Sequence, residues 1–185
     1  MNLLLDRLPI EHEGLKIDTN FRSFILFELL MQDKNVSNKD KIILTLNIFY
    51  EEIPNDIKKA MDVILWFYSR GDTDKKRNKK EQKSGKEKIY SYEHDANYIY
   101  SAFLSQYGID LNEIEYLHWW KFKSLFEGLN DENKICEIMG YRAIDLSKIK
   151  DKKQKDKYKK LKSTYALPDE RTEEEKEQDF ADAFW

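Results

Sequence analysis

Apolar residues recur at helical spacing through the first third of the chain. They predict helices over about 21–32, 39–52 and 55–70, and N-cap types stand before the first two, among them Asn20 for the first and Ser37 or Asn38 for the second. The third helix has an apolar stripe with steps of three and four residues, which consists of Ile57, Ala60, Met61, Ile64, Leu65 and Tyr68. We expect this stripe to face the core.

A second apolar block begins near Glu93, and its first helix stops at Gly108. The two helices that follow have one-sided apolar sets, Trp119, Phe122, Phe126 and Leu129 in the first and Ile135, Ile138, Met139 and Arg142 in the second. Ahead of both blocks, residues 10–17 favour a small hairpin turning at Gly14. The pattern predicts a mainly α fold, a helical bundle of about six to eight helices in two blocks with a small N-terminal β-hairpin.

Charge divides the chain further. Residues 71–88 have eight lysines or arginines, four acids and no apolar residue, so we expect a flexible linker. Residues 148–162 have nine lysines and predict a solvated helix, whereas residues 169–182 have eight acids. The expected organisation is an N-terminal hairpin and three-helix block over 1–70, a linker over 71–88, a C-terminal helical block over 89–167 and an acidic tail with an aromatic end over 168–185.

Composition favours an intracellular protein without a membrane partner. The chain has 41% hydrophobic and 36% charged residues, and its apolar runs fall far short of the roughly 20 residues that a membrane span needs. A lone Cys136 cannot form an internal disulfide, which suits the reducing cytoplasm.

The sequence offers little for catalysis. It has no glycine-rich phosphate loop, and His12, His94, His118 and Cys136 do not stand at metal-ligand spacings. We therefore expect no catalytic, cofactor-binding or metal-binding residues and no enzyme, with a nucleophilic pair of Cys136 and a histidine as the alternative. The lysine segments lack interleaved aromatic residues and the pI is about 5.8, which argues against nucleic-acid binding.

The chain has more apolar helix surface than one core face needs. Val63, Trp66 and Phe67 form a second apolar face on the third helix. Trp120 lies outside the apolar face that Trp119, Phe122 and Phe126 form. A helix packed between two neighbours is one explanation, and a docking surface is the other. The partner-binding candidates are Val63, Trp66, Phe67, Trp120, Phe180, Phe184 and Trp185.

An ordered series of motifs, FLSQYGIDL, LHWWKF, GL and a later arginine followed by leucine, resembles the phage Gp15 family of tail assembly proteins. The resemblance is strongest over residues 89–167, and Trp119, Trp120, Phe122 and Arg142 match the family pattern. It implies a protein encoded near the tape-measure protein and thought to act as a tail assembly chaperone, with no enzymatic activity. Whether the four matching residues belong to the core or contact a partner stays open.

Physics and resemblance together predict a chaperone that binds and solubilises the tape-measure protein. We expect it in the host cytoplasm, self-associating along its client and absent from the mature virion. The alternatives are a structural tail component that stays in the virion and, with less support, a nucleic-acid-binding regulator.

Overall fold

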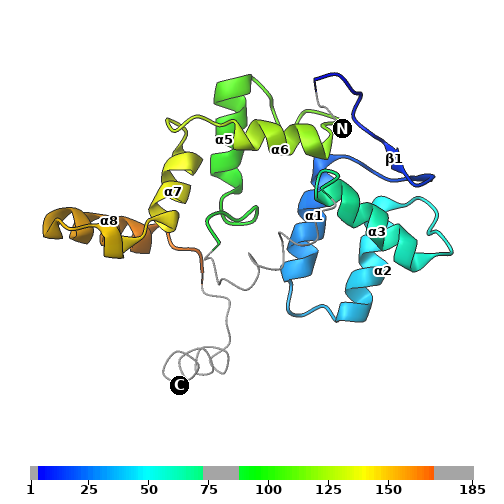
Figure 1. Cartoon of the computed structure of the whole chain (residues 1–185), viewed down its shortest axis with the longest axis horizontal. Coiled ribbons are helices and arrows are strands. Elements are labelled where there is room, and N and C mark those ends of the chain that lie inside the picture. The colour runs from blue at the N-terminus through cyan, green and yellow to red at the C-terminus, as the bar shows by residue number, and fades with distance from the viewer. Residues whose placement is uncertain (1–3, 73–87, 169–185) are drawn as a thin grey trace.

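The computed structural model describes residues 4–72 and 88–168 and confirms the mainly α fold with a small N-terminal hairpin. The molecule is elongated, with α1, α2 and α3 at one end and α8 at the other (Figure 1). The helices described are α1 (Phe21–Gln32), α2 (Asn38–Phe49), α3 (Ile57–Tyr68), α5 (Ala96–Tyr107), α6 (Trp119–Glu127), α7 (Lys134–Ala143), the short 3₁₀ helix η1 (Leu146–Lys148) and α8 (Lys152–Thr164).

The hairpin turns where glycine was expected to allow it. Strands β1 (Glu11–His12) and β2 (Leu15–Lys16) pair antiparallel, with Glu11 opposite Lys16. Between them Glu13 and Gly14 have φ angles of 50° and 78°. Two consecutive positive φ values produce the tight turn that matches the twist of a two-stranded ribbon.

Side-chain caps define where the helices begin. Asn20 accepts a hydrogen bond from the Arg22 amide at the start of α1, and Ser37 accepts one from the Asp40 amide at the start of α2. Both starts agree with the sequence. The α2 helix ends earlier than expected, at Phe49, because Tyr50 is extended and its hydroxyl donates to the Ala60 carbonyl at 2.9 Å.

Helix α6 joins the two helical blocks into one core. The Trp119 ring stacks on Phe24 of α1 with centroids 5.1 Å apart, and the Trp120 indole donates to the Phe67 carbonyl of α3 at 2.6 Å. Just before α6, the Phe21 amide donates to the Leu117 carbonyl at 2.9 Å. A single cluster of buried residues therefore extends from the hairpin to α7.

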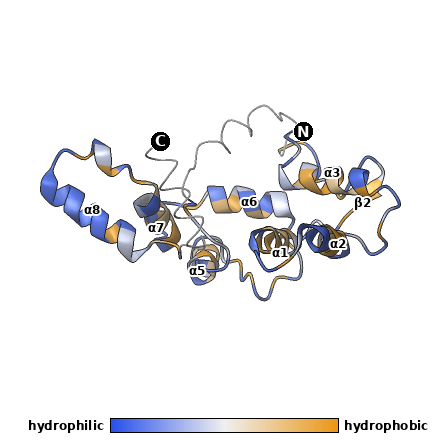
Figure 2. Ribbon diagram, turned by 90° about the horizontal axis from the view of Figure 1, so that it is seen from below, coloured by the Kyte–Doolittle hydropathy of each residue, from blue (hydrophilic) through white to orange (hydrophobic). Residues whose placement is uncertain are grey.

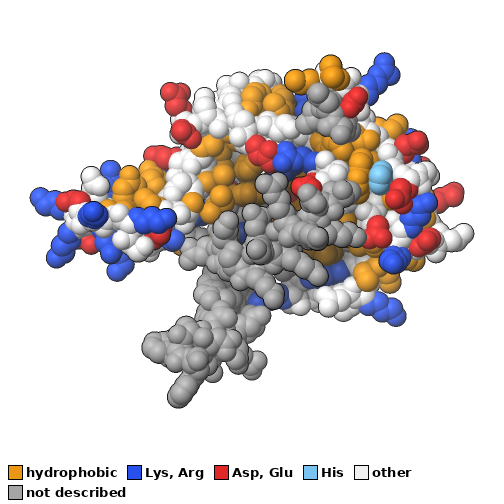
Figure 3. Space-filling view, in the orientation of Figure 1, with side chains coloured by type: hydrophobic (Ala, Val, Ile, Leu, Met, Phe, Trp, Pro, Cys, Tyr) orange, Lys and Arg blue, Asp and Glu red, His pale blue; other side chains and the backbone are white. Residues whose placement is uncertain are grey.

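Helix α8 lies outside this core. It has seven lysines and no buried residue, in agreement with the expected solvated helix. Its ribbon is mostly hydrophilic (Figure 2), and Lys and Arg side chains project from this end of the molecule in the space-filling view (Figure 3). Tyr141 of α7 makes ring contacts with Tyr158 of α8 and with Tyr165, which follows α8.

Candidate functional site

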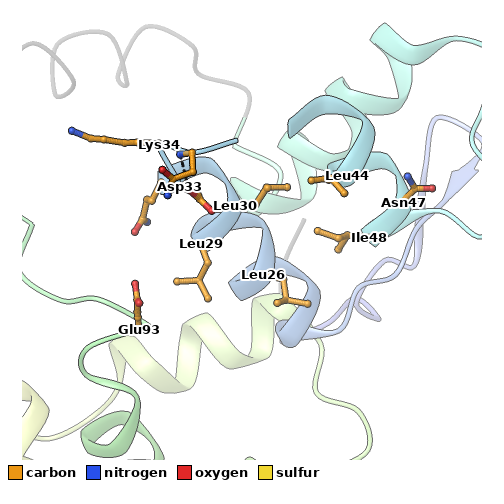
Figure 4. A pocket seen from close by; sticks show the side chains of 11 residues that line it. Leu26, Leu29, Leu30, Asp33, Lys34, Leu44, Asn47, Ile48 and Glu93 are labelled. Carbon is orange, nitrogen blue, oxygen red and sulfur yellow. Dashed lines mark hydrogen bonds between the residues drawn. The ribbon is translucent and has the colours of Figure 1, made fainter. Parts of the chain in front are cut away.

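An apolar groove runs along α1 and α2. It has a volume of about 860 Å³. Its apolar lining consists of Leu26, Leu29, Leu30, Leu44 and Ile48, and its polar rim includes Asp33, Lys34, Asn35, Asn47 and Glu93. Leu26 and Leu30 lie on the side of α1 that faces α2, whereas Leu29 points to the side on which Glu93 lies (Figure 4).

The groove exposes leucine side chains together rather than singly. Leu26 is 54% exposed and Leu44 is 43% exposed. Met31, which follows Leu30, and Ile43, which precedes Leu44, are also exposed but do not line the groove. Single exposed leucines are ordinary on a protein surface. A grouped set on two adjacent helices is typical of a surface that binds a partner.

The core uses only one side of each of these helices. Phe21, Phe24 and Phe27 of α1 are buried, as are Thr45, Leu46 and Phe49 of α2. The leucines on the other side are then left for the groove. The Lys41 ammonium donates to the Met31 carbonyl at 2.9 Å, which ties the start of α2 to the end of α1.

The structure corrects three of the predicted contact residues. Val63 and Phe67 are 1% and 0% exposed, and Trp120 is 1% exposed. They belong to the core because α3 packs against both α2 and α6, and α6 carries Trp120 against α3. Of the expected core stripe, Ala60 and Ile64 are buried, whereas Ile57 and Leu65 are exposed.

Trp66 is half-buried and lies against the hairpin. Its ring stacks on His12 with centroids 3.8 Å apart and planes inclined by 3°. On another side it approaches Trp120, at 5.3 Å between centroids. Its role in partner contact stays a prediction, as do those of Phe180, Phe184 and Trp185, which lie outside the described residues.

The residues that carry the sequence resemblance are interior. Trp119 and Phe122 are fully buried and stack on each other with centroids 5.8 Å apart. The Trp119 indole donates to the Tyr68 carbonyl at 3.2 Å. These side chains hold the fold together and do not face a partner.

Arg142 is the fourth of these residues and forms a buried ion pair with Asp95. Its guanidinium donates to both carboxylate oxygens, at 2.6 and 2.9 Å. It also donates to the carbonyls of Ile89, at 3.0 Å, and Tyr165, at 2.6 Å. The two-pronged geometry suits guanidinium and explains why arginine rather than lysine stands here.

His118 is buried in a fixed tautomer. Its Nε2 lies 2.8 Å from the Pro9 carbonyl, and its Nδ1 accepts from the Trp120 amide at 3.0 Å. Nε2 therefore carries the proton and donates to Pro9. Burial lowers the pKa of His118, against the opposite effect of the Pro9 carbonyl. This histidine caps α6.

The described part of the chain shows no metal site. Within residues 4–72 and 88–168, no group of three or more His, Cys, Asp or Glu residues is placed to hold a metal ion. Burial raises the pKa of the Cys136 thiol, which donates to the Leu129 carbonyl at 3.7 Å. Among the same residues, no helix has the length and apolar character needed to cross a membrane.

Sequence reasoning missed the groove residues of both helices. The near-continuous apolar run of α1 was a usable signal, because one helix face cannot bury Phe21, Phe24 and Phe27 as well as Leu26 and Leu30. In α2 the apolar residues Ile42 and Ile43 are exposed. Thr45 of the same helix is buried, so hydropathy alone does not indicate which side of α2 faces the core.

The fold and the groove define a small helical protein with an open apolar surface and an aromatic interior. A family model described as "Bacteriophage Gp15 protein" matches residues 4–167, and the chain belongs to this family. Membership implies a structural or assembly protein of a bacteriophage. The searches of curated proteins and of solved structures found no match.

Proposed function

We propose that this protein is a tail assembly chaperone that binds the tape-measure protein and keeps it soluble during tail assembly. The groove along α1 and α2 is the observation that carries the proposal. An amphipathic helix binds a protein by laying its apolar face in such a groove. A tape-measure protein is long and helical, and its apolar helix faces need cover until the tail tube surrounds it.

The size of the groove sets how much client one copy covers. Each of α1 and α2 has 12 residues and is therefore about 18 Å long. One copy then covers about three turns of a client helix. Several copies along one client give multivalent, reversible binding, and neighbouring copies come into contact there.

The surface away from the groove supports the same role. Charged residues make up 36% of the chain, and α8 extends its lysines at the far end from α1 and α2 (Figure 1). A complex coated with such proteins presents charge to water in place of apolar helix surface. We place this activity in the host cytoplasm, without membrane or catalysis.

The groove is tested by charge substitutions at its exposed leucines. Leu26→Asp and Leu44→Asp should each move the co-expressed tape-measure protein from the soluble to the insoluble fraction, because a carboxylate cannot be buried under a client helix. Both leucines are partly exposed, so the variants should fold. The measurement is the soluble client fraction by quantitative immunoblot.

Leu65→Asp is the matched control, because Leu65 is 47% exposed on α3 and does not line the groove. It should leave client solubility unchanged. Equal solubility with the Leu26, Leu44 and Leu65 variants would contradict the proposed groove.

The alternative function is that of a tail component retained in the particle. Mass spectrometry of purified virions separates the two functions. A chaperone should be missing from the virion, whereas a structural protein should be present at a fixed ratio to the tube subunit.

A further inference from the structure

A smaller cavity lies beside the groove and has different chemistry. Its volume is about 320 Å³, and it lies between α1 and residues 88–92. Gln32 lines both the groove and this cavity. A helix lying in the groove would therefore have the cavity at its edge. The volume is at the low end for ligand pockets, about 300–1,000 Å³, and suits one long side chain.

Glu28 places a carboxylate in this cavity without a paired cation. Its only hydrogen bond with described residues comes from the Tyr68 hydroxyl to Oε1 at 2.9 Å. The carboxylate forms no ion pair within 4.0 Å among the residues described. Burial raises the pKa of Glu28 despite the opposing effects of Tyr68, Lys123 and Lys88. A carboxylate accepts up to about four hydrogen bonds, so acceptor capacity is left over.

Two tyrosines, Tyr90 and Tyr92, line the cavity together with Ile89 and Ser91. The Tyr90 and Tyr92 rings meet edge to face with centroids 5.3 Å apart. Tyr92 is 7% exposed, and its hydroxyl has no hydrogen-bond partner among the described residues. Aromatic faces and a carboxylate are the groups that bind ammonium and guanidinium ions.

Two lysines lie near Glu28. Lys123 contacts other groups, and Lys88 lies at the edge of the cavity. The Lys123 ammonium donates to the Tyr90 hydroxyl at 3.2 Å and lies 5.5 Å from the Trp119 ring centre. Lys88 lines the cavity and is exposed. Among the described residues, Lys123 and Lys88 are thus the cations that lower the pKa of Glu28, and Lys88 is the one that lines the cavity.

We infer that the cavity binds a lysine or arginine side chain of the helix that lies in the groove. The groove then recognises an apolar helix face with a basic residue at one edge, and the cavity fixes the position of the client along it. This inference builds on the proposed function, because the tape-measure protein is its expected source of the helix.

The test is a double-mutant cycle in the full-length protein. Overlapping tape-measure peptides are first screened for binding, and each lysine or arginine of the tightest one is replaced by glutamine. Calorimetry then measures affinity for the wild type and for Glu28→Gln, which keeps an acceptor for the Tyr68 hydroxyl. We expect Glu28→Gln and one peptide substitution each to weaken binding about tenfold and to have little further effect together.

Glu113→Gln is the matched control, since it removes a negative charge from an exposed position that lines neither the groove nor the cavity. Its affinity should stay within about twofold of the wild type. The inference is overturned if Glu28→Gln leaves affinity unchanged. It is also overturned if, for every peptide substitution, the fold-losses of affinity from that substitution and from Glu28→Gln multiply in the combination, because the two groups then do not interact. If Lys88 fills the cavity instead, Glu28→Gln should lower the thermal midpoint of the free protein without changing peptide affinity.

A designed leucine-rich amphipathic peptide separates this inference from the proposed client. It carries one arginine beside its apolar face, and its partner peptide has methionine there. Suppose that no tape-measure peptide binds, that the arginine peptide binds about tenfold better than the methionine peptide, and that Glu28→Gln removes this preference. The inferred binding of a basic side chain in the cavity then holds, and the tape-measure protein is not the client. If none of these peptides binds, both proposals fail.

Discussion

Arg142 connects segments that are far apart in the sequence. Its guanidinium reaches Asp95 at the start of α5, the Ile89 carbonyl ahead of that helix and the Tyr165 carbonyl after α8. The Ser91 amide also donates to the Asp95 carboxylate, at 2.9 Å. The position of the C-terminal helices therefore depends on one buried ion pair.

Asp95→Asn should destabilise the protein by about 3–5 kcal/mol, because it leaves the Arg142 charge buried without its partner. Chemical denaturation followed by circular dichroism measures the loss. Glu137→Gln, which breaks the exposed pair with Lys134, serves as the control and should have little effect. A similar loss in both variants would show that burial does not matter at Asp95.

At this scale the sequence identified residues but not their roles. Trp119, Trp120, Phe122 and Arg142 were recognised as a set, and the structure places all four in the interior. The pairing of Arg142 with Asp95 was not predicted, since the two are 47 residues apart and no local spacing links them.

The sequence predicted where the helices begin better than it predicted which of their sides are buried. Asn20 and Ser37 cap α1 and α2 as expected, because capping is a local interaction. The core side of α3 was predicted in part: Ala60 and Ile64 are buried as expected, but Val63 and Phe67 are buried too, because α3 packs against α2 and α6. Its second neighbour, α6, contacts it through Trp119, which comes 51 residues after Tyr68. Apolar periodicity within α3 cannot predict a contact over that separation.

The cap of α6 makes the stability of the protein depend on pH. His118 must be neutral to accept from the Trp120 amide, and its pKa in the fold is lowered. In the unfolded chain a histidine takes up a proton near pH 6.5. The contribution of His118 is thus complete above about pH 6.5 and is lost as pH falls through the lower pKa of the folded state.

His118→Asn keeps a capping side chain but does not titrate. Below about pH 6.5 the free energy of unfolding should fall less steeply with decreasing pH in this variant than in the wild type. Urea unfolding at a series of pH values between 5 and 8 measures both slopes. Parallel slopes would rule out the histidine as the source of the difference. Glu28 and the other carboxylates titrate in both proteins, so their effects cancel in the comparison.

The whole molecule folds around contacts between its two halves. The α6 helix contacts α1 and α3, and the buried cluster includes residues from both sides of the 73–87 segment. The two helical blocks were predicted from sequence, but their common core was not, because the tryptophans of α6 offered no sign of which helices they meet.

Two chains covering 1–72 and 88–185 should therefore form a complex when they are co-expressed. Affinity purification of a tagged first chain should recover the second in equal amount. Trp119→Ala with Trp120→Ala should abolish recovery, because these buried rings make the contacts with α1 and α3. Independent purification of the unaltered halves would show that they do not share a core.

The position of α6 also affects the order of events during synthesis. Phe24 and Phe67 lie in helices that leave the ribosome before their partners in α6 exist. The 51 residues from Tyr68 to Trp119 take about 3–10 s to translate at 5–20 residues per second. During that interval the apolar side chains of the nascent N-terminal helices are exposed to water. Slow translation beyond codon 72 therefore prolongs the risk of aggregation.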